Sequence, residues 1–157
     1  MNYRIGVSAF IINENKEFLM VLATKEDPSE PDYWKIPAGG VENNEDLITT
    51  LKRELNEELG IDPNTLEILG KSKYIDKYDW PKYMSEKKFK ETKIWFVGQE
   101  RHIFIVKITT KNYKFKLQPE EISDIKWFNK DNFKDWLLFK DQEETMLKVI
   151  EEFKDLF

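Results

Sequence analysis

The sequence contains no cysteine among its 157 residues. This absence excludes disulfide scaffolds, thiolate zinc sites and cysteine nucleophiles. The sequence also lacks any apolar run close to the roughly 18 residues that a membrane span needs. Its first residues do not show the basic segment and long apolar segment of a signal peptide. We therefore expect a cytoplasmic protein that does not engage a membrane.

The sequence also has fewer basic than acidic residues, 25 against 30, which gives a net charge of −5. Proteins that hold long stretches of nucleic acid are usually basic. Extended nucleic-acid binding is therefore not expected, whereas contact with an RNA 5′ end through a few residues is compatible with this charge. Only three basic residues are arginines, namely Arg4, Arg53 and Arg101, and arginine suits planar, bidentate contacts.

The length and the 40% apolar content are sufficient for one folded domain over residues 1–157. Apolar patterning predicts strands separated by two helices. The predicted strands cover residues 3–12, 17–23, 66–75, 92–98, 101–109 and 122–128, and the predicted helices cover 45–59 and 141–157. Residues 38–40 are expected to turn the chain, and residues 76–91 to form a long polar loop. This order predicts an α+β fold in which a mixed β-sheet lies between helices, an α/β/α sandwich.

Three glutamates gather on one face of the first predicted helix. Glu54, Glu57 and Glu58 stand at i, i+3 and i+4, a spacing that places their carboxylates on one patch. Most acidic triplets of this kind are solvated helix faces. Carboxylates this close nevertheless repel one another unless a cation neutralises them, and oxygen ligands suit Mg²⁺, Mn²⁺ or Ca²⁺. Arg53 can pair with Glu57 at i+4 and hold its carboxylate in place.

The residues around this triplet complete a longer pattern. Between Gly39 and Ile61 the chain fits G-x5-E-x7-R-E-U-x-E-E-x-G-U, where U is a bulky aliphatic residue, at all nine fixed positions. This segment resembles the Nudix box, and the chain is similar to the Nudix hydrolases. The resemblance implies a Nudix fold with box residues 39–61.

The resemblance also implies the chemistry of the site. Glu54, Glu57 and Glu58 would hold Mg²⁺ or Mn²⁺ against a pyrophosphate, and the turn at Gly39 would bring backbone carbonyls near the metal. Water would attack a phosphorus of a nucleoside diphosphate linked to another group, mainly with charge stabilisation by the metals. Within the box, Glu57, Glu58 and Arg53 are the catalytic candidates.

Outside the box, the chain resembles the branch of dinucleoside polyphosphate hydrolases and RNA 5′-pyrophosphohydrolases. The similar segments are residues 3–7, 34–40, 78–81 and 96–104. This branch has a further glutamate, six residues before a tryptophan, that completes the metal site. Glu121 stands six residues before Trp127, so Glu121 rather than its neighbour Glu120 is the expected ligand or metal-linked base.

Candidate phosphate contacts come from the same resemblance. Arg4, Tyr78 and Arg101 lie in segments similar to the substrate-facing ones of the branch, and Lys35 adjoins the box. His102 stands where the branch usually has lysine; protonated, it could contact phosphate, and otherwise it is an ordinary strand residue. An aromatic residue of 78–83 or Phe104 could stack on a base.

The expected function is therefore metal-dependent cleavage of a phosphoanhydride bond. The substrate would be a dinucleoside polyphosphate, such as diadenosine tetraphosphate, or a 5′-triphosphate RNA end. One alternative is an enzyme that removes modified nucleoside triphosphates from the nucleotide pool. Another is a nucleotide-sensing Nudix module without activity, which the presence of all three box glutamates disfavours.

Overall fold

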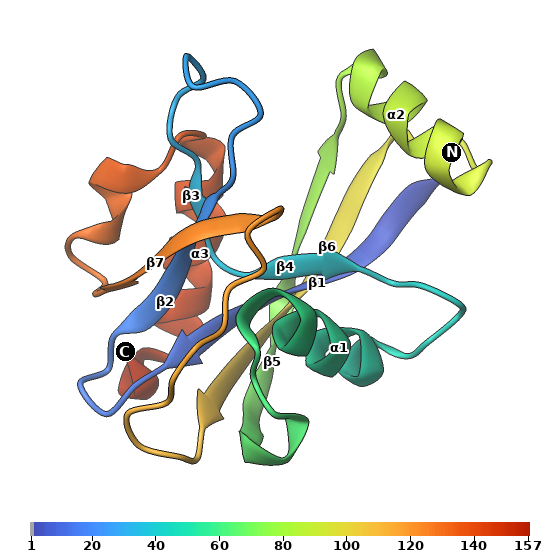
Figure 1. Ribbon diagram of the computed structural model, residues 1–157. Helices are drawn as coiled ribbons and strands as arrows, with labels where there is room; N and C mark the ends of the chain where they lie inside the picture. The colour runs from blue at the N-terminus through green and yellow to red at the C-terminus, as the bar shows by residue number, and fades with distance from the viewer. Residues whose placement is uncertain (1) are drawn as a thin grey trace.

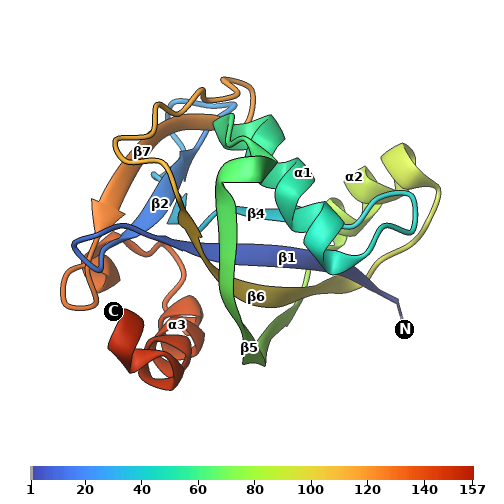
Figure 2. The same ribbon diagram turned by 90° about the horizontal axis from the view of Figure 1, so that it is seen from below.

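The computed structural model describes residues 2–157, which form a mixed seven-stranded sheet between helices (Figures 1 and 2). The strands are β1 (Tyr3–Ile12), β2 (Phe18–Ala23), β3 (Trp34–Lys35), β4 (Ala38–Gly40), β5 (Leu66–Asp79), β6 (Gly98–Ile108) and β7 (Ile122–Phe128). The helices are α1 (Leu47–Leu59), α2 (Lys82–Thr92) and α3 (Asp141–Glu152), with short 3₁₀ turns at Pro63–Thr65, Phe133–Trp136 and Lys154–Leu156.

The sheet divides into two arms. One arm holds β1, β6 and β5, with β1 parallel to β6 over the whole of its length and β5 antiparallel to β6. The other arm holds β2, β3 and β7. β1 pairs with β2 only where Ile12 lies opposite Phe18. Nearer its start, β1 pairs with β4 instead. The arms therefore diverge from the β1–β2 turn, as Figure 1 shows.

Each face of the sheet carries its own apolar core, because successive strand residues point to opposite faces. Val7, Ala9 and Ile11 of β1 join the cluster under α1, whereas Phe10 and Ile12 join the cluster under α3. α1 and α3 thus cover opposite faces of the sheet. The predicted α+β class, with a mixed sheet between helices, is confirmed.

The first predicted helix is present but begins two residues later than expected. The Asp46 carboxylate accepts a hydrogen bond from the Thr49 amide at 2.7 Å and caps the helix. Leu51, Leu55 and Leu59 are buried as their spacing predicts. Gly60 ends the helix in the left-handed region at φ 66°, a conformation that favours glycine.

The region that follows differs most from the sequence expectation. Residues 76–91 do not form a loop, because β5 continues to Asp79 and α2 occupies 82–92. The strand predicted over 92–98 is absent, and β6 is one strand from Gly98 to Ile108. α2 was missed because it buries only Ser85 and so has no apolar periodicity to reveal it.

Two smaller differences complete the comparison. Residues 38–40 form the short strand β4 rather than a turn, and the last helix ends at Glu152 before a 3₁₀ turn. Among the residues that the structure describes, no helix has the length and apolar content to span a membrane.

Candidate active site

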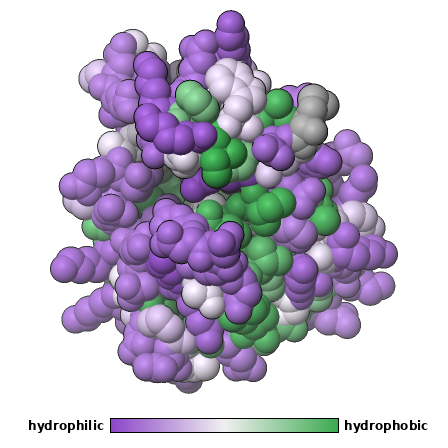
Figure 3. Space-filling view, turned by 90° about the vertical axis from the view of Figure 1, so that its right-hand side faces the viewer, coloured by the Kyte–Doolittle hydropathy of each residue, from purple (hydrophilic) through white to green (hydrophobic). Residues whose placement is uncertain are grey.

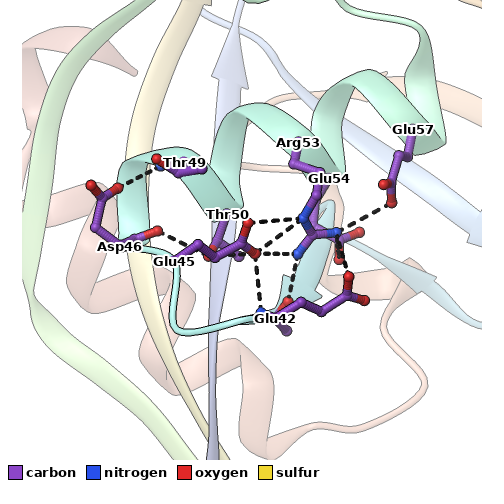
Figure 4. A network of polar contacts seen from close by, with 9 residues as sticks. Glu42, Glu45, Asp46, Thr49, Thr50, Arg53, Glu54 and Glu57 are labelled. Carbon is purple, nitrogen blue, oxygen red and sulfur yellow. Dashed lines mark hydrogen bonds and ion pairs between the residues drawn. The ribbon is translucent and has the colours of Figure 1, made fainter.

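Arg53 is the centre of a polar network that ties α1 to the loop before it (Figure 4). Its Nε donates to Glu45 at 3.0 Å, and its Nη2 donates to the Gly40 carbonyl at 2.9 Å. Its Nη1 donates to Glu54 at 3.0 Å and to Glu57 at 3.2 Å. The predicted pairing of Arg53 with Glu57 is confirmed. The guanidinium therefore fixes two box glutamates relative to the strand end.

Glu45 and Arg53 hold each other in the charged state. The Arg53 hydrogen bond is the main reason that the pKa of Glu45 falls to about 2. The same contact raises the pKa of Arg53 above its usual value. Their side chains are only 12% and 22% exposed, so water weakens this pair less than it would a surface pair. Arg53 is in this structure a positioning residue for the glutamates.

Glu54 lies directly over the backbone of β4. A Cβ atom on Gly39 would collide with the Glu54 carboxylate, so glycine at this position provides room for the acid. Gly39 has no left-handed φ and pairs with Val7 of β1. The reason for this glycine is therefore close approach, not the sharp turn that the sequence analysis expected. Burial raises the pKa of Glu54, and Arg53 opposes that rise.

Glu58 and Glu121 come together because the segment before β7 docks on the end of α1. The Lys116 and Gln118 amides donate to the carbonyls of Leu59 and Glu58, at 2.9 and 3.0 Å, and satisfy acceptors that the helix end leaves open. Burial, together with the negative charges of Glu54 and Glu121, raises the pKa of Glu58 to about 8, and Lys35 opposes this rise.

Lys35 of β3 lies within electrostatic reach of these acids and of a second cation, Arg101. Burial lowers its pKa, and the positive charge of Arg101 lowers it further. Glu58, Glu121 and Glu54 act in the opposite direction. Lys35 also lies 5.6 Å above the Tyr33 ring. Lys35 therefore experiences opposing charges, those of the three acids and that of Arg101, with which it lines a common cavity.

The phosphate-contact candidates of the first arm share one face of the sheet. Strand register aligns Arg4, Gln99 and Tyr78 in one row across β1, β6 and β5, and Arg101 with Asp76 in the next. These positions lie on the same face of the sheet as α3, which covers that face nearer the other end of the strands. Arg4 lies over Gly40, where a Cβ would meet its guanidinium, and the Arg101 guanidinium lies 5.6 Å from the Tyr78 ring centre.

Two buried donors on this side have no acceptor. Within residues 2–157, Trp80 Nε1 and Arg101 Nε are the only buried side-chain nitrogen or oxygen atoms without a hydrogen-bond partner. Buried polar groups are nearly always paired, so Trp80 Nε1 and Arg101 Nε are available to donate to a bound ligand. Arg101 also lines a small cavity of about 30 Å³ with Lys35, Asp76 and Gln142 of α3.

His102 is not brought to this face. The neighbouring residues Ile103 and Phe104 belong to the α3 and α1 cores respectively, so alternation places His102 on the α1 face, opposite Arg101. Its Nε2 lies 3.2 Å from Glu100. Phe104 is 2% exposed and packs in the core, which removes it as a base-stacking residue.

Comparison with known proteins identifies the family of this chain. The model of the NUDIX domain matches residues 2–153. This chain belongs to the Nudix family. It is 31% identical over 156 residues to an RNA pyrophosphohydrolase of a Nitratiruptor species, covering 97% of this chain and 94% of that protein. It is 27% identical over 154 residues to the RNA pyrophosphohydrolase of Erythrobacter litoralis, covering 94% and 90%.

Solved Nudix structures share the fold. The binary complex of a C. elegans Ap4A hydrolase superposes with a TM-score of 0.67 at 18% identity, covering 97% of this chain and 99% of that one. The E. coli dihydroneopterin triphosphate pyrophosphohydrolase gives the same TM-score at 14% identity, covering 97% and 99%.

Two polar residues near the candidate site were not singled out by the sequence. Asp76 is paired by register with Arg101, and Gln142 donates to the Tyr33 hydroxyl at 3.0 Å. No motif marks Asp76 or Gln142, because strand register and the docking of α3 bring them into place. Trp80, whose Nε1 has no partner, lies in the similar segment 78–81 and was considered from the sequence only for stacking on a base.

Across residues 2–157, no three acidic or histidine side chains lie close enough together to form a metal site by themselves. The donor set nevertheless suits a hard divalent cation, since it consists of carboxylate oxygens. The pKa of Glu58 is raised, mainly by burial and then by the negative charge of Glu54, and Lys35 opposes this rise.

Proposed function

We propose that this Nudix hydrolase, with Mg²⁺ or Mn²⁺, cleaves a phosphoanhydride bond of a dinucleoside polyphosphate or of a 5′-triphosphate RNA end. Membership of the family makes the chain a hydrolase of phosphoanhydride bonds. The substrate and the metal are the proposed part. Similarity to RNA pyrophosphohydrolases over nearly the whole chain and a fold shared with an Ap4A hydrolase are consistent with both substrates.

The observation that carries the proposal is the mixed charge around Lys35. Three acids, Glu58, Glu121 and Glu54, and one like charge, Arg101, lie within electrostatic reach of this lysine. A complex of a divalent cation with a polyphosphate would complement both sets of charges. The cation would neutralise the acids, and phosphate oxygens would accept from the cations.

The box glutamates and Glu121 are the residues that would hold the metal. When bound, the metal would stabilise negative charge on the reacting phosphate and lower the pKa of the attacking water. Arg53 would keep Glu54 and Glu57 in position through its hydrogen bonds. Arg101, Lys35 and Arg4 would bind phosphate oxygens, so that water attacks one phosphorus while the leaving phosphate or nucleotide remains bound.

Two further donors extend the phosphate site beyond the metals. Trp80 Nε1 and Arg101 Nε are both buried and unpartnered, and the Tyr78 hydroxyl bonds only weakly to Gln99 at 3.3 Å. A chain of several phosphates can reach these donors and the metals together, whereas a short triphosphate reaches fewer of them. Longer polyphosphates should therefore have the higher kcat/KM.

A substrate panel with Mg²⁺ and Mn²⁺ tests the proposal, with products identified by chromatography. The panel contains diadenosine tetraphosphate, 5′-triphosphate RNA, ordinary nucleoside triphosphates and oxidised nucleoside triphosphates. We expect the first two to have the higher kcat/KM. Equal or better kcat/KM on a nucleoside triphosphate would favour the pool-cleaning alternative. Binding without turnover of any substrate would favour a sensing module.

A further inference from the structure

α2 is an exposed, basic helix that follows β5, the strand of Asp76 and Tyr78, and the mechanism above does not use it. Residues 82–93 contain five lysines and two glutamates, a local excess of positive charge in a chain of net charge −5. Two residues separate the end of β5 from the start of α2, and Glu91 of α2 lies close enough to Arg4 for their charges to interact. Figure 3 shows this part of the surface as mostly hydrophilic, with apolar side chains between the polar ones.

The outer face of α2 combines a ring with positive charges. Ser85 is the one buried residue of the helix, and helical spacing places Tyr83, Lys87 and Lys90 at i, i+4 and i+7 on the opposite side. The Tyr83 side chain is 69% exposed. Beside this stripe, the rings of Phe89 and Trp95 lie 6.1 Å apart and are both exposed.

The ion pairs of Lys87 and Lys82 are long and exposed, so phosphates can replace them. Lys87 lies 3.7 Å from Glu26 of the loop between β2 and β3, with side chains 69% and 88% exposed. Lys82 lies 3.9 Å from Glu86. Exposed pairs of this kind contribute little to stability. The Lys87–Glu26 contact also shows that α2 lies within reach of the β2–β3 loop of the other arm.

We infer that α2 binds the nucleotides that follow the 5′ end of a single-stranded RNA substrate. Lysines alternating with exposed aromatic rings are the combination that binds single strands, because the cations follow the phosphates and the rings stack on the bases. The helix is about 16 Å long, so it contacts a few nucleotides, in keeping with the overall negative charge. The inference rests on the proposed function and selects RNA over dinucleoside polyphosphate as the substrate that uses this surface.

Binding is measured first, without hydrolysis, by fluorescence anisotropy of a labelled 5′-hydroxyl RNA of about ten nucleotides. Lys87→Ala/Lys90→Ala should weaken binding roughly tenfold at low salt and reduce the slope of log K against log[salt] by about 1.4. The matched control is Lys111→Ala/Lys114→Ala, which changes two exposed lysines in the segment after β6. These lysines follow the end of β6, whereas α2 precedes its start, so the control should leave binding unchanged. Tyr83→Ala should weaken binding, whereas Tyr83→Phe should not.

Catalysis is then compared on 5′-triphosphate RNA and on diadenosine tetraphosphate. Lys87→Ala/Lys90→Ala should lower kcat/KM on the RNA and leave the value on diadenosine tetraphosphate unchanged. Equal losses on both substrates, or unchanged RNA binding, would overturn the inference. If the enzyme hydrolyses neither substrate while the α2 variants still lose RNA binding, the proposed function fails and the assignment of α2 stands. Unchanged unfolding temperatures would show that the variants are folded.

Discussion

α1 and α2 both border the candidate active site, but they are held in place in opposite ways. α1 is capped at both ends, buries Leu51, Leu55 and Leu59, and is tied to the preceding loop by Arg53. α2 begins at Pro81 without a side-chain cap, and only its Ser85 is buried. Its ion pairs at Lys82 and Lys87 are exposed.

This difference separates the chemistry from the recognition of a long substrate. Reacting groups must be held to within a fraction of an ångström, and α1 provides that through packing and a network of hydrogen bonds. A surface that follows a flexible strand needs charge and exposed rings rather than fixed geometry. Changes in α1 should therefore cost activity or stability, whereas the same kinds of change in α2 should cost neither on a short substrate.

The largest contrast is expected between two glutamates, one in each helix. Glu58→Gln should lower kcat on the order of a thousand-fold with the fold intact, since it removes charge from the proposed metal site. Glu86→Gln in α2 changes a half-exposed carboxylate and should leave kcat on diadenosine tetraphosphate unchanged. Steady-state kinetics at saturating Mg²⁺ measure both. Near-normal kcat for Glu58→Gln would refute the metal-site assignment.

The next contrast lies in the segment that docks on α1. Glu121→Gln should lower kcat/KM on the order of a hundred-fold, because Glu121 lies beside Glu58 and Lys35. Glu120→Gln, one residue away, should have a mild effect. Assays of the two variants side by side check the choice, and the reverse ranking would show that Glu120 is the functional acid.

Stability should also distinguish the two helices. Arg53→Ala leaves Glu45 without its main partner. Because the Glu45 side chain is only 12% exposed, water cannot fully replace Arg53, and the free energy of unfolding should fall by about 2 kcal/mol. Lys88→Ala in α2 removes a short contact to Glu91 of 2.6 Å but should cost under about 0.5 kcal/mol, because Glu91 is half exposed. Urea unfolding measures both. A larger loss for Lys88→Ala would mean that α2 is anchored more firmly than its burial indicates.

The same difference explains what the sequence could predict. The leucine spacing, Gly60 and the box pattern are local signals, so α1 and its acids could be found from consecutive residues. α2 has no apolar stripe, so its residues resembled a loop. The site residues Asp76 and Gln142 depend on β5–β6 register and on the docking of α3, which join residues far apart in the chain. Gly39 was identified, but for a turn; its role in admitting Glu54 needs the helix and the strand together.

The smallest effect is expected in how the stability of the protein depends on pH. Two ion-paired carboxylates can be compared, Glu45 before α1 and Glu91 in α2. The Arg53 hydrogen bond lowers the pKa of Glu45 from 4.5 to about 2, and the Lys88 hydrogen bond lowers the pKa of Glu91. A carboxyl with a lower pKa in the folded state stabilises the fold fully above its unfolded pKa, and loses this contribution as the pH falls through the folded value. The contribution of Glu45 should therefore be complete above about pH 5 and disappear toward pH 2.

Thermal unfolding of Glu45→Gln and Glu91→Gln between these pH values measures the contrast. Glu45→Gln should be less stable than the parent protein near neutral pH, and the gap should close on acidification, because the protonated parent side chain no longer attracts Arg53. Glu91→Gln should follow the parent closely throughout, since water surrounds half of its side chain and screens the Lys88 contact. A gap for Glu45→Gln that stays constant down to pH 2 would mean that shape and hydrogen bonding, rather than charge, hold the loop to α1.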